Sequence, residues 1–159
     1  MARRQSQALL DDVAWRLLNV LQTDGRAPLK TLAVSAGLSI AATAERLKRL
    51  QELGPVRAIA ADVDPVKAGY PVKAIVGITV TKPGKRALIE KLRKAPEVIE
   101  CHHVAGVDSY MMIVVGESLA ELERFVGTIN PYGETHTSIV FSTPIERRGI
   151  VEPGSVRRS

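Results

Sequence analysis

The segment formed by residues 10–56 constrains the fold of this chain most, because helical hydrophobic patterns meet in it at a tight turn. In the first pattern, apolar residues recur every three or four positions, the spacing of one helix face. These residues are Leu10, Val13, Leu17, Val20 and Leu21. Asp11 is placed to cap a helix over residues 11–24, and Gly25 is placed to stop it.

Two more helices are predicted after this one. Pro28 stands where a short second helix begins, since the first helical position tolerates a missing N–H, and Leu29, Leu32 and Ala33 supply its buried face. Gly37 permits the turn, and Ser39 caps a third helix over residues 40–53. The positions expected to face inward on that helix share one stripe: Ile40, Thr43, Leu47 and Leu50.

The opposite face of the third helix combines small residues at its start with cations further along. Including the cap and one residue on the flank, the candidate DNA-binding residues are Ser39, Ala41, Ala42, Glu45, Arg46, Lys48 and Arg49. Small residues let a helix approach base edges, while Arg and Lys contact phosphates. The alternative is an ordinary solvated basic face, but the preceding short helix and glycine turn favour a helix-turn-helix that binds double-stranded DNA.

Composition limits the class of protein. The chain has 159 residues, 45% of them hydrophobic, which is enough for one ordinary core or two small ones. The net charge of +5 permits a nucleic-acid partner without proving one. No apolar run reaches the roughly 20 residues of a membrane span, and no secretory signal is present, so we expect a cytoplasmic protein. With Cys101 as the single cysteine, an intrachain disulfide and the paired-cysteine zinc patterns are excluded.

After residue 56 the pattern becomes extended, and turn residues concentrate between residues 64 and 71. We interpret residues 56–71 as a linker that includes a strand. The elements expected next alternate as strand 72–80, helix 84–94, strand 98–105, strand 110–115, helix 118–129 and strand 135–141. This βαββαβ order predicts an α+β protein in which an N-terminal helix-turn-helix domain (1–55) precedes a ferredoxin-like domain (72–147) and a basic tail (148–159).

Two of the predicted strands carry apolar residues on both faces. In the strand 72–80, Ile75 lies opposite the apolar row Ala74, Val76, Ile78 and Val80, and in the strand 110–115, Met111, Ile113 and Val115 lie opposite Met112 and Val114. A two-layer domain has helices for only one face of its sheet, so the second face would expose a large apolar patch. We therefore expect another subunit to cover it, which gives a homodimer suited to two DNA half-sites.

The chain resembles the Lrp/AsnC family of leucine-responsive and asparagine-operon (feast/famine) regulators over nearly its whole length. The order and spacing of several short motifs carry the resemblance. In the first half they are Leu10-Asp11, Leu17-Leu18, Leu21-Gln22, Asp24-Gly25-Arg26, Gly37-Leu38-Ser39, Arg46-Leu47, Leu50, Gly54, Val56, Asp64-Pro65 and Gly69. In the second half they are Glu100-Cys101-His102, Val104, Gly106, Tyr110 and Thr135-His136-Thr137.

The resemblance implies a transcriptional regulator with a C-terminal domain that binds an amino acid or a related small metabolite at a subunit interface. It also implies dimers that assemble into octamers, and control of amino-acid metabolism genes. Two positions depart from the family pattern. Ala14 replaces a second Asp of the first helix, and Ser109 stands at the Asp position of a Gly-x-x-Asp-Tyr loop, with the carboxylate displaced to Asp108.

The loop 106–110 has chemistry suited to a free amino acid. Asp108 can pair with an α-ammonium group, Ser109 can hydrogen-bond, and Gly106 lets backbone approach a carboxylate. By analogy with the family, the candidate effector-binding residues are Gly106, Asp108, Ser109, Tyr110, Thr135 and Thr137. The competing interpretation is an ordinary hairpin, since Asp and Gly are common turn residues.

The three histidines and the cysteine raise the question of a metal site. Neighbouring strand residues point to opposite faces, so His102 and His103 do not share one ion easily, whereas Cys101 and His103 could. A third ligand from His136 would require two strands to be adjacent. We favour core or interface histidines, and expect neither a metal nor a cofactor.

No catalytic constellation is present, because the chain lacks a phosphate loop, a nucleophile elbow and a zinc-protease helix. Two alternatives to a regulator stay open. One is an enzyme that resembles the siroheme decarboxylases, although their histidine- and tryptophan-containing strand signature is missing and Trp15 lies in the first helix. The other is an architectural DNA-binding protein without an effector. The prediction that fits best is a DNA-binding regulator that is not an enzyme.

Overall fold

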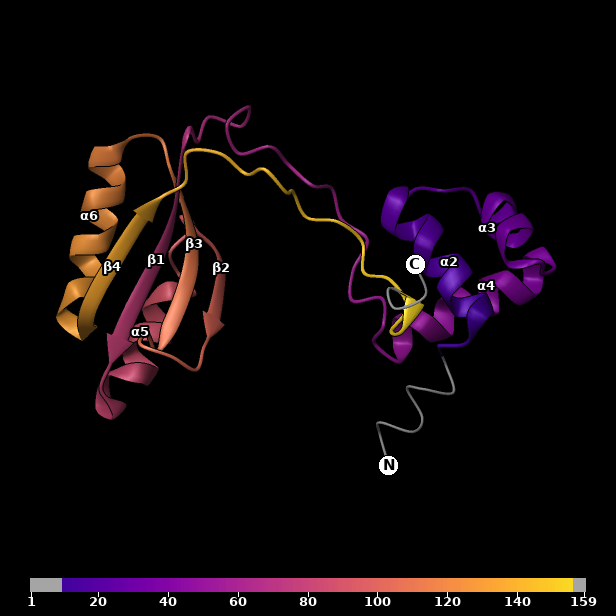
Figure 1. Cartoon of the computed structure of the whole chain (residues 1–159), viewed down its shortest axis with the longest axis horizontal. Coiled ribbons are helices and arrows are strands. Elements are labelled where there is room, and N and C mark those ends of the chain that lie inside the picture. The colour runs from indigo at the N-terminus through magenta and orange to yellow at the C-terminus, as the bar shows by residue number, and fades with distance from the viewer. Residues whose placement is uncertain (1–9, 156–159) are drawn as a thin grey trace. The chain divides into compact units, whose positions relative to one another are not determined.

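The computed structural model describes residues 10–155, and these form two compact units (Figure 1). The first unit comprises the chain up to Ala61 together with the segment from Glu146, and the second comprises Asp62–Ile145. The C-terminal segment thus returns to the N-terminal unit. Among the described residues, no helix is long and apolar enough to cross a membrane.

The first unit contains three helices, α2 (Asp12–Thr23), α3 (Leu29–Ala36) and α4 (Ile40–Glu52), as expected. Asp11 caps α2, because its side chain accepts a hydrogen bond from the Ala14 N–H at 2.9 Å. Gly37 ends α3 in the left-handed conformation, with φ 69°, which glycine adopts without steric cost. Ser39 caps α4 through the Ala42 N–H at 3.2 Å. These caps confirm the predicted start of α2, the glycine turn after α3 and the start of α4.

Apolar residues of the three helices form one core, made of Ala14, Trp15, Leu17, Leu18, Leu32, Ala36 and Leu50. Two sequence predictions for this unit are wrong in detail. Ile40 was expected to face inward but is 54% exposed, because it begins α4 and the buried stripe starts one turn later, at Thr43. Pro28 occupies the N-cap position of α3, with φ −57° and ψ 144°, and is not its first helical residue.

The second unit confirms the predicted βαββαβ order. Its elements are β1 (Val72–Val80), η1 (Lys82–Gly84), α5 (Lys85–Leu92), β2 (Val98–His103), β3 (Tyr110–Gly116), α6 (Leu119–Ile129), η2 (Asn130–Tyr132) and β4 (Gly133–Ile139). The four strands pair antiparallel in the order β2-β3-β1-β4, the order of a ferredoxin-like sheet. The predicted helix over 84–94 is shorter, because its first turn is the 3₁₀ segment η1 and α5 ends at Leu92.

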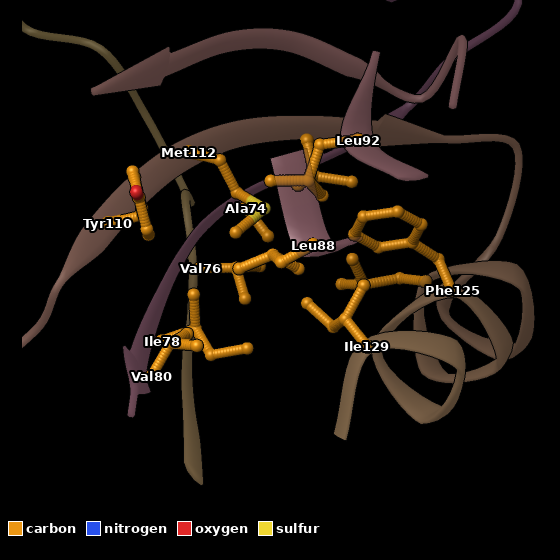
Figure 2. Packing of buried hydrophobic residues seen from close by; sticks show 12 residues of the cluster. Ala74, Val76, Ile78, Val80, Leu88, Leu92, Tyr110, Met112, Phe125 and Ile129 are labelled. Atoms are coloured by element: carbon orange, nitrogen blue, oxygen red, sulfur yellow. The ribbon is translucent and has the colours of Figure 1, made fainter. Parts of the chain in front are cut away.

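One face of this sheet packs against the two helices. Figure 2 shows Val76 and Ile78 of β1 converging with Leu88 of α5 and with Phe125 and Ile129 of α6. Fully burying such a side chain stabilises a fold by roughly 1.5–3 kcal/mol. Alternation along β1 and β3 therefore determines which residues the helices cover.

The other face of the sheet, here called the outer face, carries apolar side chains that no helix of the unit covers. Ile75 of β1 and its neighbour Ile113 of β3 lie at its centre, with Met111 beside them. Ile75 and Met111 are each 38% exposed, and Ile113 is half-buried. Val115 was expected on this face as well, but it is buried at the end of β3. The two-sided apolar pattern is thus present in the folded chain.

The linker contains no strand, contrary to the sequence prediction. Residues 57–63 have no regular secondary structure and form no backbone pairing with another described residue, and a strand requires such a partner. A tight turn follows, in which Asp64 caps the N–H of Val66 at 2.9 Å and the Tyr70 N–H donates to Pro65 O at 2.8 Å.

Candidate DNA-binding face and effector loop

The exposed face of α4 contains most of the residues predicted to bind DNA. The residues Ser39, Ala41, Ala42, Glu45, Lys48 and Arg49 are all exposed. Thr43 and Leu50, on the opposite side of α4, are fully buried. The hydroxyl of Thr43 donates to the Ser39 carbonyl at 2.9 Å, which ties the start of the helix to the turn. The helix is therefore held by one face while its small residues and cations are accessible.

Arg46, predicted on the flank of this face, lies between two helices. Its side chain is 23% exposed and forms an ion pair with the Asp11 carboxylate at 2.5 Å. Burial disfavours the ionised carboxyl of Asp11, but the hydrogen bond from Ala14 and the guanidinium of Arg46 outweigh it and lower the pKa of Asp11. The same carboxylate thus caps α2 and holds α4 against it.

Lys48 and Arg49 are the cations that α4 presents to solvent. Lys48 lies 3.8 Å from the Glu52 carboxylate one turn later, and both side chains are more than half exposed. Exposed pairs of this kind contribute about 0–1 kcal/mol, so Lys48 can exchange its partner for a phosphate at little cost. These two cations, following the small residues at the start of the helix, match the arrangement expected for a recognition helix.

The predicted effector loop folds back onto the end of β1, and Ser109 fixes it there. The Ser109 hydroxyl accepts from the Val80 N–H at 3.1 Å and donates to the Val80 carbonyl at 3.3 Å. Its own N–H donates to Ile78 O at 2.9 Å. The threonine at position 79 adds a hydrogen bond from its hydroxyl to Val107 O at 3.0 Å. The Ser109 hydroxyl proton is already donated to the Val80 carbonyl, so it is not free for a ligand. The role of Ser109 is therefore to position the loop.

Asp108 lies over the outer face of the sheet at Gly77. A Cβ at position 77 would overlap the Asp108 carboxylate, so only glycine leaves room for it. The Asp108 side chain is 18% exposed, and its Oδ1 is buried with no hydrogen-bond donor among the described residues. The imidazole of His136 in β4 lies beside it, with Nδ1 3.6 Å from Oδ1, and forms an ion pair with the carboxylate only when protonated. The outer face therefore contains a carboxylate that is poorly solvated and only partly compensated.

The remaining predicted effector residues lie elsewhere in the chain. Thr135 and Thr137 pair with Ile78 and Val76, which face the helices, so the register places both threonines on the side of the sheet opposite Asp108. The Thr135 hydroxyl donates to Asn130 Oδ1 at 2.7 Å. The expectation that these threonines share a pocket with Asp108 is therefore wrong within a single chain, because β4 has two faces and the carboxylate occupies the other one.

Tyr110 and Gly106 flank the loop. Tyr110 is 9% exposed and packs against the His103 ring, with centroids 5.0 Å apart. It faces a surface hollow of about 430 Å³ lined by α5 residues, among them Lys85, whose Nζ lies 6.0 Å from the tyrosine ring. No atom comes within 4 Å of the space that a Gly106 Cβ would occupy. Gly106 therefore borders open space, whereas Tyr110 belongs to the helix side of the sheet.

The strand order separates the histidines that a metal site would need. β2 and β4 are the two edge strands of the sheet, with β3 and β1 between them. His103 pairs with Tyr110 on the helix side, whereas His136 pairs with Gly77 and faces outward. Within residues 10–155, no group of three or more His, Cys, Asp or Glu side chains is arranged to hold a metal ion.

Two residues of this site were not assigned to it by sequence reasoning. His136 was considered as part of a family motif, as a possible metal ligand and as a core or interface histidine, but not as an effector residue, and Gly77 was not singled out. A glycine in the middle of an apolar strand is nevertheless a signal, because it often marks a close approach by another group. The approaching group, Asp108, is 31 residues away, so only the fold identifies it.

A three-helix unit with an accessible basic helix, joined to a separate ferredoxin-like domain, defines the class of two-domain DNA-binding regulators. The comparisons with known proteins agree with this class. Residues 10–51 match the AsnC-type helix-turn-helix domain, and residues 73–150 match the Lrp/AsnC ligand-binding domain. The chain belongs to the Lrp/AsnC family of transcriptional regulators.

Individual relatives support this assignment. The chain is 34% identical to the HTH-type transcriptional regulator FL11 of Pyrococcus furiosus over 138 residues, 84% of this chain and 91% of that protein. The structure of LrpC from Bacillus subtilis matches with a TM-score of 0.82 and 28% identity, covering 87% of this chain and 99% of that one. A feast or famine regulatory protein from M. tuberculosis, complexed with L-methionine, matches with a TM-score of 0.83 and 33% identity, covering 90% and 99%.

Proposed function

We propose that this regulator reads DNA with the exposed face of α4 and senses an amino acid on its second domain. The DNA-contacting residues of the proposal are Ser39, Ala41, Ala42, Glu45, Lys48 and Arg49. Small side chains at the start of the helix permit close approach to base edges in the major groove, and the later cations neutralise phosphates. Arg46 has a positioning role, since its contact with Asp11 sets how α4 packs on α2.

We propose that the outer face of the sheet joins two copies of this chain. Ile75, Met111 and Ile113 form its apolar centre, and burying them between two sheets removes their surface from water on both copies. A homodimer also supplies the two recognition helices that a pair of DNA half-sites requires. The family resemblance extends this assembly to an octamer, which the native mass of the full chain would test.

The effector part of the proposal depends on one observation, the buried Oδ1 of Asp108, which accepts no hydrogen bond from the described residues and has only His136 Nδ1 at 3.6 Å beside it. A carboxylate taken out of water without a full partner is costly, and an α-ammonium group would compensate it. The outer-face position agrees with an effector held at a subunit interface. The ligand-binding domain match over residues 73–150 and the L-methionine complex of a relative support an amino acid as the ligand.

The proposed site is smaller than the set predicted from the sequence. Asp108 is its charged residue and Gly106 borders its open side, while Gly77 and Ser109 position the carboxylate. His136 lies at its edge. Tyr110, Thr135 and Thr137, which lie on the helix side of their own sheet, enter the proposal only through a neighbouring subunit.

Calorimetric titration with each of the common amino acids tests the effector proposal. For the ligand that binds best, Asp108→Asn should weaken binding by about 1.5–3 kcal/mol, the range for a hydrogen bond to a charged group. Glu100→Gln is the matched control, because Glu100 is another carboxylate of this sheet but is exposed and paired with His102. Its affinity should equal that of the unsubstituted protein.

The titration also separates this proposal from its competitors. If a ligand binds equally well to Asp108→Asn, Asp108 is a turn residue and the effector site lies elsewhere. If no amino acid binds the unsubstituted chain, the architectural alternative replaces sensing. We infer that the chain is not an enzyme, as its relatives are named transcriptional regulators, and unchanged siroheme absorbance after incubation with the protein would agree with that.

A further inference from the structure

The C-terminal segment is attached to the helix-turn-helix unit by one side chain. The carboxamide of Gln22, near the end of α2, accepts a hydrogen bond from the Ile150 N–H at 2.7 Å and donates one to the Ile150 carbonyl at 3.0 Å. A single side chain thus satisfies both backbone groups of one residue, as a neighbouring strand would. Ile150 itself is 70% exposed, so this pairing and not burial holds it.

The residue before Ile150 fits the same contact closely. A Cβ on Gly149 would lie 3.1–3.2 Å from the side-chain atoms of Gln22, which is tighter than ordinary van der Waals contact. A larger residue at position 149 would therefore push the Gln22 carboxamide away. The contact can be disrupted from either side, from the helix or from the tail.

The linker contacts the same end of α2. Gly25, three residues after Gln22, faces Ile59, because a Cβ on Gly25 would lie 2.9 Å from Ile59 Cγ2. The linker and the C-terminal tail therefore contact the first unit at Gly25 and Gln22, positions about one helical turn apart. Both positions belong to the same compact unit.

At the other end, the two connecting segments join neighbouring strands. The linker enters β1 at Val72, and the tail leaves β4 at Ile139, which pairs with Ala74 of β1. The Val140 N–H continues this pairing with Lys73 O at 2.8 Å. The ten residues 140–149 that follow span at most about 35 Å. The two units are thus linked by two short segments that are neighbours at both ends.

We propose that the Gln22–Ile150 contact converts the C-terminal tail into a second tether, which restrains rotation of the helix-turn-helix unit against the effector domain. A single flexible linker lets a domain rotate about its bonds, whereas two tethers with neighbouring attachment points must wind around each other as the domain rotates. The tail also connects β4, which carries His136 beside the Asp108 carboxylate, to α2 of the DNA-binding unit. The effector domain is therefore connected to the DNA-binding unit by both the linker and the C-terminal tail.

Trp15 offers an internal probe of this restraint. It is the single tryptophan of the chain, lies in α2 and is 7% exposed, so its ring rotates with the helix-turn-helix unit. Time-resolved fluorescence anisotropy of the full chain should show Trp15 following the whole particle. Gln22→Ala removes both hydrogen bonds and should add a nanosecond component, and Gly149→Val should add the same component from the tail side.

Two further variants complete the test. Asn19→Ala, on the exposed side of α2 one turn earlier, is the matched control and should leave the decay unchanged. Combining Gln22→Ala with Gly149→Val should give no more mobility than either alone, because both remove one contact. Circular dichroism at the working temperature should be the same for all variants, since Gln22 and Gly149 are exposed.

Amide hydrogen exchange distinguishes the contact from its consequence. In the unsubstituted chain the Ile150 amide should exchange more slowly than in Gln22→Ala, because Gln22 Oε1 is its acceptor. Slow exchange in the unsubstituted chain together with unchanged anisotropy in Gln22→Ala would overturn the tether. Equal exchange rates in the two proteins would overturn the contact itself. Neither result depends on DNA or effector binding, so the proposed function stands or fails separately.

Discussion

Asp11 shows how one side chain connects local and tertiary structure in this protein. Its carboxylate caps α2 through the Ala14 N–H and pairs with Arg46 of α4. The capping interaction is local, three residues apart, while the ion pair depends on how the two helices pack. A single carboxylate therefore stabilises the start of α2 and the packing of α4 against it.

Asp11→Ala should lower the free energy of unfolding of the first unit by about 1 kcal/mol at neutral pH, the typical cost of losing a cap. The folded pKa of Asp11 lies below its ordinary value of 3.8. Its contribution is thus present above that value and is lost as the pH falls through the lower folded pKa. Urea denaturation followed by Trp15 fluorescence at several pH values would measure this.

The neighbouring residue provides the control for that experiment. Asp12 is exposed in the first turn of α2 and is not the cap, so Asp12→Ala should cost less than Asp11→Ala at neutral pH. A stability difference between Asp11→Ala and the unsubstituted chain that persisted unchanged to pH 2 would contradict a role for the ionised carboxylate.

Arg49 is the cation of α4 that most directly tests the DNA-binding face. It is exposed, so Arg49→Ala should leave the fold intact while weakening DNA binding. A lost phosphate contact should reduce the slope of log K against log salt by about one per bound protomer. Fluorescence anisotropy titrations of a labelled duplex at several salt concentrations would give the slope. Arg86→Ala, an exposed cation of α5, should keep the original slope; the same slope for Arg49→Ala would remove that residue from the interface.

At the scale of elements, the sheet of the second unit has two faces with different surroundings. Its helix-facing side is a core that α5 and α6 complete within one chain. Its outer face has apolar residues at the centre and the Asp108 carboxylate over Gly77. Because alternate residues of one strand serve the two faces, adjacent substitutions should have different effects.

Substitutions by Asp on the two faces test this distinction. Met112→Asp places a charge in the helix-covered core, where Met112 is 1% exposed, and should prevent accumulation of folded protein. Ile75→Asp places the charge on the outer face, where 38% exposure leaves it access to water in one chain. It should yield folded protein of lower native mass, measured by light scattering and circular dichroism. A folded Ile75→Asp protein with the original mass would contradict the proposal that the outer face joins two copies of the chain.

On the scale of the whole molecule, the two units have separate cores and separate spectroscopic reporters. Trp15 belongs to the first core, whereas the three tyrosines, Tyr70, Tyr110 and Tyr132, all belong to the second unit. No cluster of buried apolar residues spans both units in the described chain. Each unit can therefore be destabilised by itself.

Leu50→Ala should destabilise the first unit by about 2–5 kcal/mol, since Leu50 is fully buried in α4. The midpoint of unfolding reported by Trp15 fluorescence should fall, while the tyrosine signal of the second unit should move little. Leu88→Ala, fully buried in α5, is the reciprocal variant and should shift the tyrosine transition instead. Coincident shifts of both signals in either variant would indicate one cooperative unit.

Local features of the sequence accounted for most of the elements. The caps Asp11 and Ser39 and the turn at Gly37 depend on hydrogen bonds and backbone angles within a few residues, which the chain specifies by itself. Alternation along β1 and β3 identified the two faces of the sheet, because the side-chain period of a strand is fixed at two. The predictions that Ile40 faces inward and that the linker contains a strand were wrong, because exposure at a helix end and strand pairing both depend on neighbours elsewhere in the chain.

Only the tertiary structure decided which residues meet. Asp108 lies over Gly77, Thr135 and Thr137 face away from it, and Gln22 holds Ile150, which is 128 positions away. Hydrophobic periodicity indicates which side of an element is buried but not which element covers it. Contacts between residues so far apart in the sequence therefore cannot be predicted from it. The sequence by itself determined a helix-turn-helix regulator with a ferredoxin-like domain. The packing of distant segments decided where the buried Asp108 carboxylate lies and how the tail is attached, because those contacts exist only after the chain has folded.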